Sequence, residues 1–120
     1  MAPGTFRELL ARYREGERQF AGAELDEDPD HDLTGLILDG IDLSGSFVVA
    51  TFTKASLRGA SFRRANVKTC DFCGCDLRDA DFSGAALDAT SFTNANLEGA
   101  CFEGATVQGY ALTEDERPDW

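Results

Sequence analysis

Apolar residues recur at every fifth position along most of this chain. From Ala50 onward, the third residue of each pentad is Phe, Leu or Val in all thirteen pentads, the last ending at Leu112. The first residue is Ala in nine of the thirteen, and the other positions are mostly polar residues or Gly. An α-helix does not explain this period, because residues five apart drift around the helix axis. Short extended segments with the first and third residues pointing inward, each followed by a corner, do explain it.

The central residues also predict how many sides each coil has. Phe recurs every ten residues, with Leu or Val between. A three-sided coil stacks Phe on Leu, and a two-sided coil leaves no interior for facing rings. A four-sided coil of about twenty residues stacks like on like, with coils about 4.8 Å apart. We therefore expect two Phe ladders on opposite sides of the interior: Phe52, Phe72 and Phe92, and Phe62, Phe82 and Phe102.

The repeat continues upstream of Ala50, but one residue out of step. The pentads HDLTG, LILDG and IDLSG are centred on Leu33, Leu38 and Leu43. We expect the frame to change between Leu43 and Phe47, which makes Phe47 a central, inward residue. This predicts a four-residue side with a tight corner near Gly45.

Before these pentads, the chain carries two degenerate repeats and a helix signal. The repeats are centred on Phe20 and Leu25, and Asp-Pro-Asp at residues 28–30 is typical of a loop. Thr5 and Glu8 form a capping box, so a helix is expected from about residue 5 to Gly16. Its apolar stripe is expected to cover the first coil, although a partner-binding role is the alternative. The stripe consists of Phe6, Leu9, Leu10 and Tyr13.

The pentads resemble a known family, the pentapeptide repeat proteins. The segments ADFSG, ANLEG and CDLRD resemble that family's motif A-(D/N)-L-x-x, and the resemblance covers about residues 31–112. It implies an all-β solenoid, a right-handed four-sided parallel β-helix, here of about four to five coils with a short N-terminal helical cap. We expect a single domain, with a capping helix at 1–18, the β-helix at 19–112 and a C-terminal cap or tail at 113–120.

The C-terminal residues are expected to close the last coil. Residues 113–116 fit a second capping box, which Pro118 limits to about a turn. Tyr110 stands in the inward position usually held by Ala, and Leu112 and Trp120 follow it. The alternative, implied by the resemblance to some family members, is that Tyr110, Leu112 and Trp120 form a homodimer contact.

The composition narrows the functional classes. The chain has 22 acidic and 11 basic residues, giving a net charge of -11, which argues against direct nucleic acid binding. No stretch approaches the length of a membrane span, so no membrane contact is expected and we expect a cytoplasmic protein. The four cysteines are expected to be free thiols.

Three of these cysteines lie in the segment CDFCGC, which by spacing alone suggests a metal or redox site. The pentad frame places Cys70 and Cys75 in the inward position otherwise held by Ala, and points Cys73 outward. Cys101 is expected to point outward on the opposite face. Because zinc needs four converging ligands, and the one histidine, His31, lies elsewhere, we expect neither a metal site nor a cofactor.

No nucleophile–His–acid set or phosphate-binding loop is present, so an enzyme is not expected. Asp71, Asp76 and Asp81 occupy the second pentad position, where we interpret them as hydrogen-bonding residues that shape each side. The sequence favours a non-catalytic, rigid protein–protein interaction module whose partner is unassigned. A basic band is the candidate interaction surface for an acidic partner, with an ordinary solvated surface as the alternative. The band consists of Arg58, Arg63, Arg64, Lys68 and Arg78.

The resemblance implies a second function. Some pentapeptide repeat proteins mimic B-form DNA, bind DNA gyrase or topoisomerase IV, and protect against quinolones or gyrase toxins. The net charge of -11 agrees with this role. The short length of the expected rod and its basic middle do not.

Overall fold

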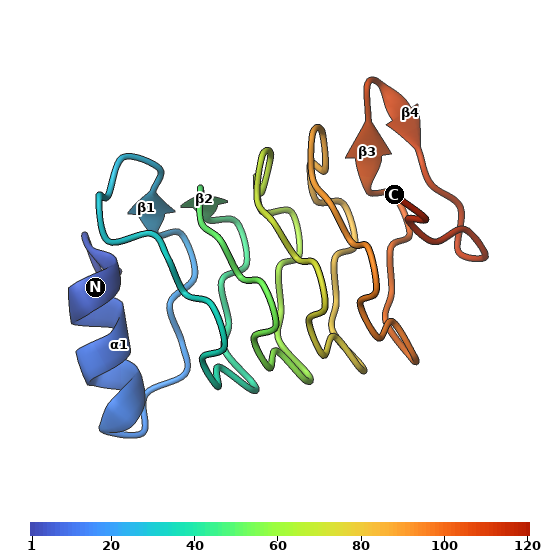
Figure 1. The fold of residues 1–120 in the computed structure, drawn as a ribbon. Coiled ribbons are helices and arrows are strands. Elements are labelled where there is room, and N and C mark those ends of the chain that lie inside the picture. The colour runs from blue at the N-terminus through green and yellow to red at the C-terminus, as the bar shows by residue number, and fades with distance from the viewer.

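A computed structural model describes residues 1–120 as a coil of stacked turns with one helix at its N-terminal end (Figure 1). Parallel bridges join residues twenty apart, from Thr51 with Asp71 to Ala86 with Thr106. Twenty residues are four pentads, so each of these turns has four sides, as the sequence predicts. The molecule measures 36 × 23 × 22 Å.

Regular strands are few, because a corner interrupts the chain every five residues. At the N-terminal end, β1 (Glu24–Leu25) pairs in parallel with β2 (Phe47–Val48). At the C-terminal end, β3 (Thr106–Val107) pairs antiparallel with β4 (Tyr110–Ala111). Elsewhere each side contributes one bridge and then a turn.

The corners need a left-handed backbone at the fifth pentad position. Gly99 has φ 74°, and a Cβ there would collide with the Asp79 carboxylate of the coil below. Lys54 and Arg64 adopt the same conformation without being glycine, at φ 60° and 56°. This conformation costs a non-glycine residue about 1–2 kcal/mol. At the corners without glycine, the stacking of the coils therefore holds the backbone against its local preference.

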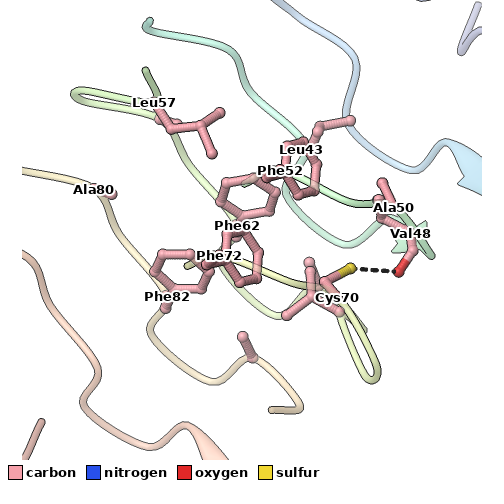
Figure 2. Packing of buried hydrophobic residues seen from close by; sticks show 14 of the residues in the cluster. Leu43, Val48, Ala50, Phe52, Leu57, Phe62, Cys70, Phe72, Ala80 and Phe82 are labelled. Atoms are coloured by element: carbon pink, nitrogen blue, oxygen red, sulfur yellow. Dashed lines mark hydrogen bonds between the residues drawn. The ribbon is translucent and has the colours of Figure 1, made fainter. Parts of the chain in front are cut away.

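Two interlocked Phe ladders run through the interior, with Leu, Val and Ala side chains packed around them (Figure 2). Within each ladder the rings are stacked, with centroids 4.9–5.2 Å apart and planes within 4–9° of parallel. Rings of opposite ladders meet edge to face at 5.3–6.0 Å. Both arrangements are favourable for aromatic pairs. The predicted ladders are thus confirmed.

The predicted position of the frame change is wrong. Val48 is fully buried, whereas Phe47 is 40% exposed, so Val48 and not Phe47 is the central residue of its side. The four-residue side exists, but it is formed by residues 46–49, and Gly45 is an ordinary corner with φ 65°. Ser46 fills the inward first position, where its hydroxyl accepts from the Ala23 amide at 3.0 Å. Because Phe47 and Val48 are adjacent apolar residues, the pattern of apolar positions alone does not distinguish the two frames.

The first coil is longer than the others. Gln19 bridges Asp42, a separation of 23 residues, because the loop at residues 26–31 adds three. Phe20 and Leu25 are each 1% exposed, which confirms that the degenerate repeats belong to the coil.

The helix α1 (Phe6–Arg14) lies against this first coil (Figure 1). Thr5 Oγ1 accepts from the Glu8 amide at 3.1 Å, and Phe6 and Leu9 are buried in the core. The loop fixes the start of the helix, because the Asp28 carboxylate accepts from the Phe6 amide at 2.6 Å and from the Asp30 amide at 2.8 Å. These two hydrogen bonds lower the pKa of Asp28 below its usual value.

At the other end, the last predicted pentad leaves the coil. A turn at Gln108 and Gly109 reverses the chain, so Tyr110 lies on the hairpin and is 56% exposed. The prediction that Tyr110 points inward is therefore wrong. Leu112 is 7% exposed and packs on the core, with its amide donating to Ala105 O at 2.8 Å.

The tail after the hairpin runs back over the last coil. A main-chain oxygen of Trp120 accepts from the Phe92 amide at 2.5 Å, and the Trp120 indole N–H donates to Thr90 Oγ1 at 3.3 Å. Residues 113–116 form a turn, not a helix, in which the Glu116 carboxylate accepts from the Thr113 amide at 2.9 Å.

Candidate functional site

The basic band lies on three adjacent sides of the coil, and most of its charges are paired. Arg58 donates to Asp39 through both Nη2 (2.9 Å) and Nε (3.2 Å), and Arg78 Nη2 donates to Asp76 at 2.7 Å. Burial by itself raises the pKa of Asp39, but hydrogen bonds from Ser56 and Arg58 outweigh it and lower the pKa. This side therefore carries an ordered network of opposite charges.

The remaining band residues lie on the next two sides. Arg63 pairs with Asp81 at 3.3 Å and Lys68 with Asp88 at 3.8 Å, whereas Arg64 has no carboxylate within 4.0 Å. The ion pairs of Arg63 and Lys68 join residues 18 and 20 positions apart in the sequence, from one coil to the next. Counting charge along the chain missed these pairs, because the compensating acids belong to neighbouring coils.

All four cysteines are free and stand where the pentad frame predicts. Cys70 Sγ donates to Val48 O at 3.2 Å (Figure 2), and Cys75 Sγ donates to Phe52 O at 2.7 Å. Burial raises the pKa of both thiols to about 12. Cys73 and Cys101 are half-buried on the outside, each about 3 Å from a serine hydroxyl of the next or previous coil (3.0 and 3.1 Å). No three His, Cys, Asp or Glu side chains gather in a way that would hold a metal ion.

This placement predicts two classes of thiol. In the folded protein, Cys73 and Cys101 are expected to react with iodoacetamide at neutral pH, while Cys70 and Cys75 stay protected because they are buried and remain protonated. Mass spectrometry of peptides after timed labelling gives the order of reaction. In urea, all four should react at similar rates. Early labelling of Cys75 in the folded protein would contradict its inward position.

The aspartates of the second pentad position shape the coil, as the sequence analysis interprets them. Asp71 accepts from the Cys73 amide at 2.8 Å, and Asp81 accepts from the Ser83 amide at 2.9 Å. Asp76 makes the same contact with the Arg78 amide at 3.3 Å. Each carboxylate is thus engaged by the backbone two residues later, an Asx turn.

The C-terminal end leaves one side of the last coil uncovered. Ala95 and Leu97 are half-buried, whereas Cys75 and Leu77, directly below them in the previous coil, are 1% and 0% exposed. The Leu77 amide donates to Asn96 O at 2.9 Å, but the Leu97 amide has no such acceptor in the chain. The tail covers the neighbouring Phe92 side instead.

The exposed side chain of Ile37 is a surface feature that the repeat pattern does not predict. Ile37 is 69% exposed beside α1, at the second position of its pentad. The residues stacked above it on the same side are Ser56, Asp76 and Asn96. The signal was present in the segment LILDG, the one pentad from residue 31 onward with a large aliphatic residue at both its first and second positions.

A comparison with protein families decides the identity of the repeat. The family model described as pentapeptide repeat region matches residues 45–116. The chain belongs to the pentapeptide repeat proteins. Its fold is accordingly the right-handed quadrilateral β-helix of that family, as the resemblance implies.

Solved structures of pentapeptide repeat proteins resemble this chain. The protein alr5209 from Nostoc PCC 7120 is 32% identical, with a TM-score of 0.50, over 98% of this chain and 93% of that one. HetL, involved in heterocyst differentiation regulation in Nostoc sp. strain PCC 7120, is 27% identical, with a TM-score of 0.49. This chain aligns over 78% of its own length but spans only 49% of HetL.

QnrB1, a plasmid-mediated fluoroquinolone resistance protein, is a more distant match, 18% identical with a TM-score of 0.34 over 72% of this chain and 49% of that one. The chain matches none of the curated protein sequences. No helix in it has the length and apolar character needed to cross a bilayer.

Proposed function

We propose that this pentapeptide repeat protein is a non-catalytic, rigid interaction module that presents fixed side chains to a protein partner in the cytoplasm. The observation that carries the proposal is the interlocked pair of Phe ladders, which fixes the spacing of the surface side chains from one coil to the next. In this proposal, α1 caps the N-terminal coil, and the rod has about four to five coils. Ordered side chains on such a rod lose little conformational entropy on binding.

The basic band is the surface we assign to an acidic partner. Its ion pairs are half-exposed, and exposed pairs contribute only about 0.2–1 kcal/mol each, so a partner's carboxylates replace Asp81 or Asp88 at small cost. Arg64 is exposed and has no carboxylate to displace.

Affinity capture from the source organism tests this role. Immobilised wild-type protein is expected to retain a partner at a stoichiometric level, and Arg64→Glu should reduce the retained amount about tenfold or more. Lys54→Glu is the matched control. Lys54 is also an exposed corner residue, with φ 60° against 56°, it lies outside the band, and it has no ion pair. Absence of any specific partner would reject the proposal, and equal losses with both variants would reject the band as the surface.

DNA mimicry is the alternative, favoured by the net charge of -11 and the width of 22–23 Å. The charge density is lower than that of DNA, since a duplex as long as this 36 Å rod carries about 21 negative charges. The side centred on Leu57 and Leu77 also alternates in sign, from Asp39 through Arg58 to Asp76. A gyrase supercoiling assay separates the two roles. Interaction-module function predicts no effect at micromolar protein, whereas inhibition would establish the alternative.

A homodimer through the C-terminal end would lengthen the rod. The exposed Tyr110, the buried Leu112 and the docked Trp120 frame this end, and the uncovered Leu97 side lies on the same coil. Sedimentation should give twice the chain mass of 13.0 kDa if this contact forms, and Leu97→Glu should restore the monomer.

A further inference from the structure

A groove runs along the seam between α1 and the first coil. One part, of about 260 Å³, is lined by Leu10, Tyr13, Arg14 and Arg18 on one wall and by residues 36–38 on the other. An adjoining part, of about 430 Å³, shares Leu10 and Arg14 and extends to the loop at residues 29–33. Both parts are open to solvent along the seam.

The floor of the smaller part carries apolar side chains that are not buried in the core. Ile37 points outward at 69% exposure, and Leu10 and Leu36 are only half-buried. The residues stacked above Ile37 are polar, which is what an outward position on this side requires. Ile37 is therefore an exposed aliphatic side chain set beside two further apolar residues in a hollow.

The lining of the smaller part is positively charged, whereas the protein as a whole has a net charge of -11. Its lining contains Arg14 and Arg18 and no acidic residue, in a chain with 22 acids and 11 bases. Arg14 has no carboxylate within 4.0 Å, and Arg18 donates only to the backbone oxygens of Tyr13 and Glu17. The Arg18 guanidinium also lies 3.7 Å from the centroid of the Tyr13 ring, which fixes it at the wall. The adjoining part has a mixed lining, with Asp30 and Asp32 beside Arg7 and Arg14. On the coil wall, the Asp39 carboxylate is engaged by Ser56 and Arg58.

From these observations we propose that the smaller part of the groove between α1 and the first coil is a docking site for an acidic peptide segment of a protein partner, with apolar side chains as anchors. Apolar side chains of the segment enter the hollow at Leu10 and Ile37, and its carboxylates pair with Arg14 and Arg18. This inference rests on the proposed interaction role, but it places the partner on a surface different from the basic band. It also gives α1 a role in recognition in addition to covering the first coil.

Selection from a displayed library of random peptides on the purified protein tests the site. Enriched sequences are expected to combine Glu or Asp with Leu, Ile or Phe. In fluorescence anisotropy titrations, Arg14→Glu and Ile37→Ser should each weaken the best peptide about tenfold. Lys54→Glu, a charge reversal at an exposed basic residue outside both surfaces, and Phe47→Ser, an exposed apolar residue on another side, should change affinity less than about twofold.

Several results would overturn the inference. They are no enrichment, enrichment of basic sequences, and weakening by Lys54→Glu as large as that by Arg14→Glu. Competition by anionic lipid vesicles would assign the groove to a membrane surface, and self-association that Arg14→Glu abolishes would assign it to a second copy. The titration uses purified protein, so its outcome is independent of partner capture. A captured partner that is lost with Arg64→Glu but kept with Arg14→Glu would leave the interaction role standing and remove only this site.

Discussion

Replacing Phe72 with Ala is expected to lower the free energy of unfolding by about 3–5 kcal/mol. Phe72 stacks on Phe52 at 5.2 Å and on Phe92 at 5.0 Å, and it meets two rings of the opposite ladder edge to face. The substitution leaves a cavity in the middle of both ladders, which the neighbouring coils cannot close because their spacing is fixed by backbone bridges. Urea denaturation followed by circular dichroism measures the loss.

Phe47→Ala is the matched control for this substitution. Phe47 is 40% exposed, and its replacement is expected to cost within about 1 kcal/mol. A loss at Phe47 as large as that at Phe72 would mean that Phe47 is the inward residue and that the frame changes before it. The pair of variants thus tests the core and the position of the short side together.

Placing a carboxylate in the small inward position is expected to prevent folding. Ala65 is 1% exposed at the first position of its pentad, and Ala65→Asp buries a charge with no cation beside it. The penalty for an unpaired buried ion is several kcal/mol, which is comparable to the whole stability of a domain of this size, about 5–15 kcal/mol. Solubility on expression and circular dichroism report the outcome.

The neighbouring substitution Asn66→Asp introduces the same charge one residue later. The Asn66 side-chain oxygen already accepts from the Lys68 amide at 3.2 Å, as the aspartates of other pentads do two residues on. We expect a change within about 0.5 kcal/mol. Stable folding of Ala65→Asp, or equal damage from both variants, would contradict the alternation of inward and outward positions.

The sequence predicts the interior of this protein well because one physical constraint repeats. Every coil must bury a central apolar residue and a small first residue, so the two Phe ladders and the inward Cys70 and Cys75 follow from spacing alone. Where two apolar residues adjoin, as at Phe47 and Val48, the constraint is satisfied in either frame. In the structure Val48 is the inward residue, because Gly45 forms the positive-φ corner and the inward Ser46 hydroxyl accepts from the Ala23 amide.

The surface and the ends were predicted less well. The partners of Arg63 and Lys68 lie in the next coil, so the balance of charge depends on stacking and not on local composition. The hairpin that carries Tyr110 depends on a reversal at Gln108, where Asp88 accepts the Gln108 amide at 2.6 Å. The groove at Ile37 depends on where α1 lies, which the pattern of the helix alone does not give.

Residues stacked in neighbouring coils are always close in sequence, and this affects how the chain folds. Ladder contacts join residues 19–23 apart, and the widest side-chain hydrogen bond, from Trp120 to Thr90, spans 30. A ladder contact therefore spans about a sixth of this 120-residue chain, and the bond from Trp120 to Thr90 spans a quarter of it. Each coil contacts only its neighbouring coils, so it can form once one of them is folded, before the far end of the chain has folded. Folding is expected to advance along the axis one coil at a time, and pulling on the two termini should unwind the rod coil by coil from its ends.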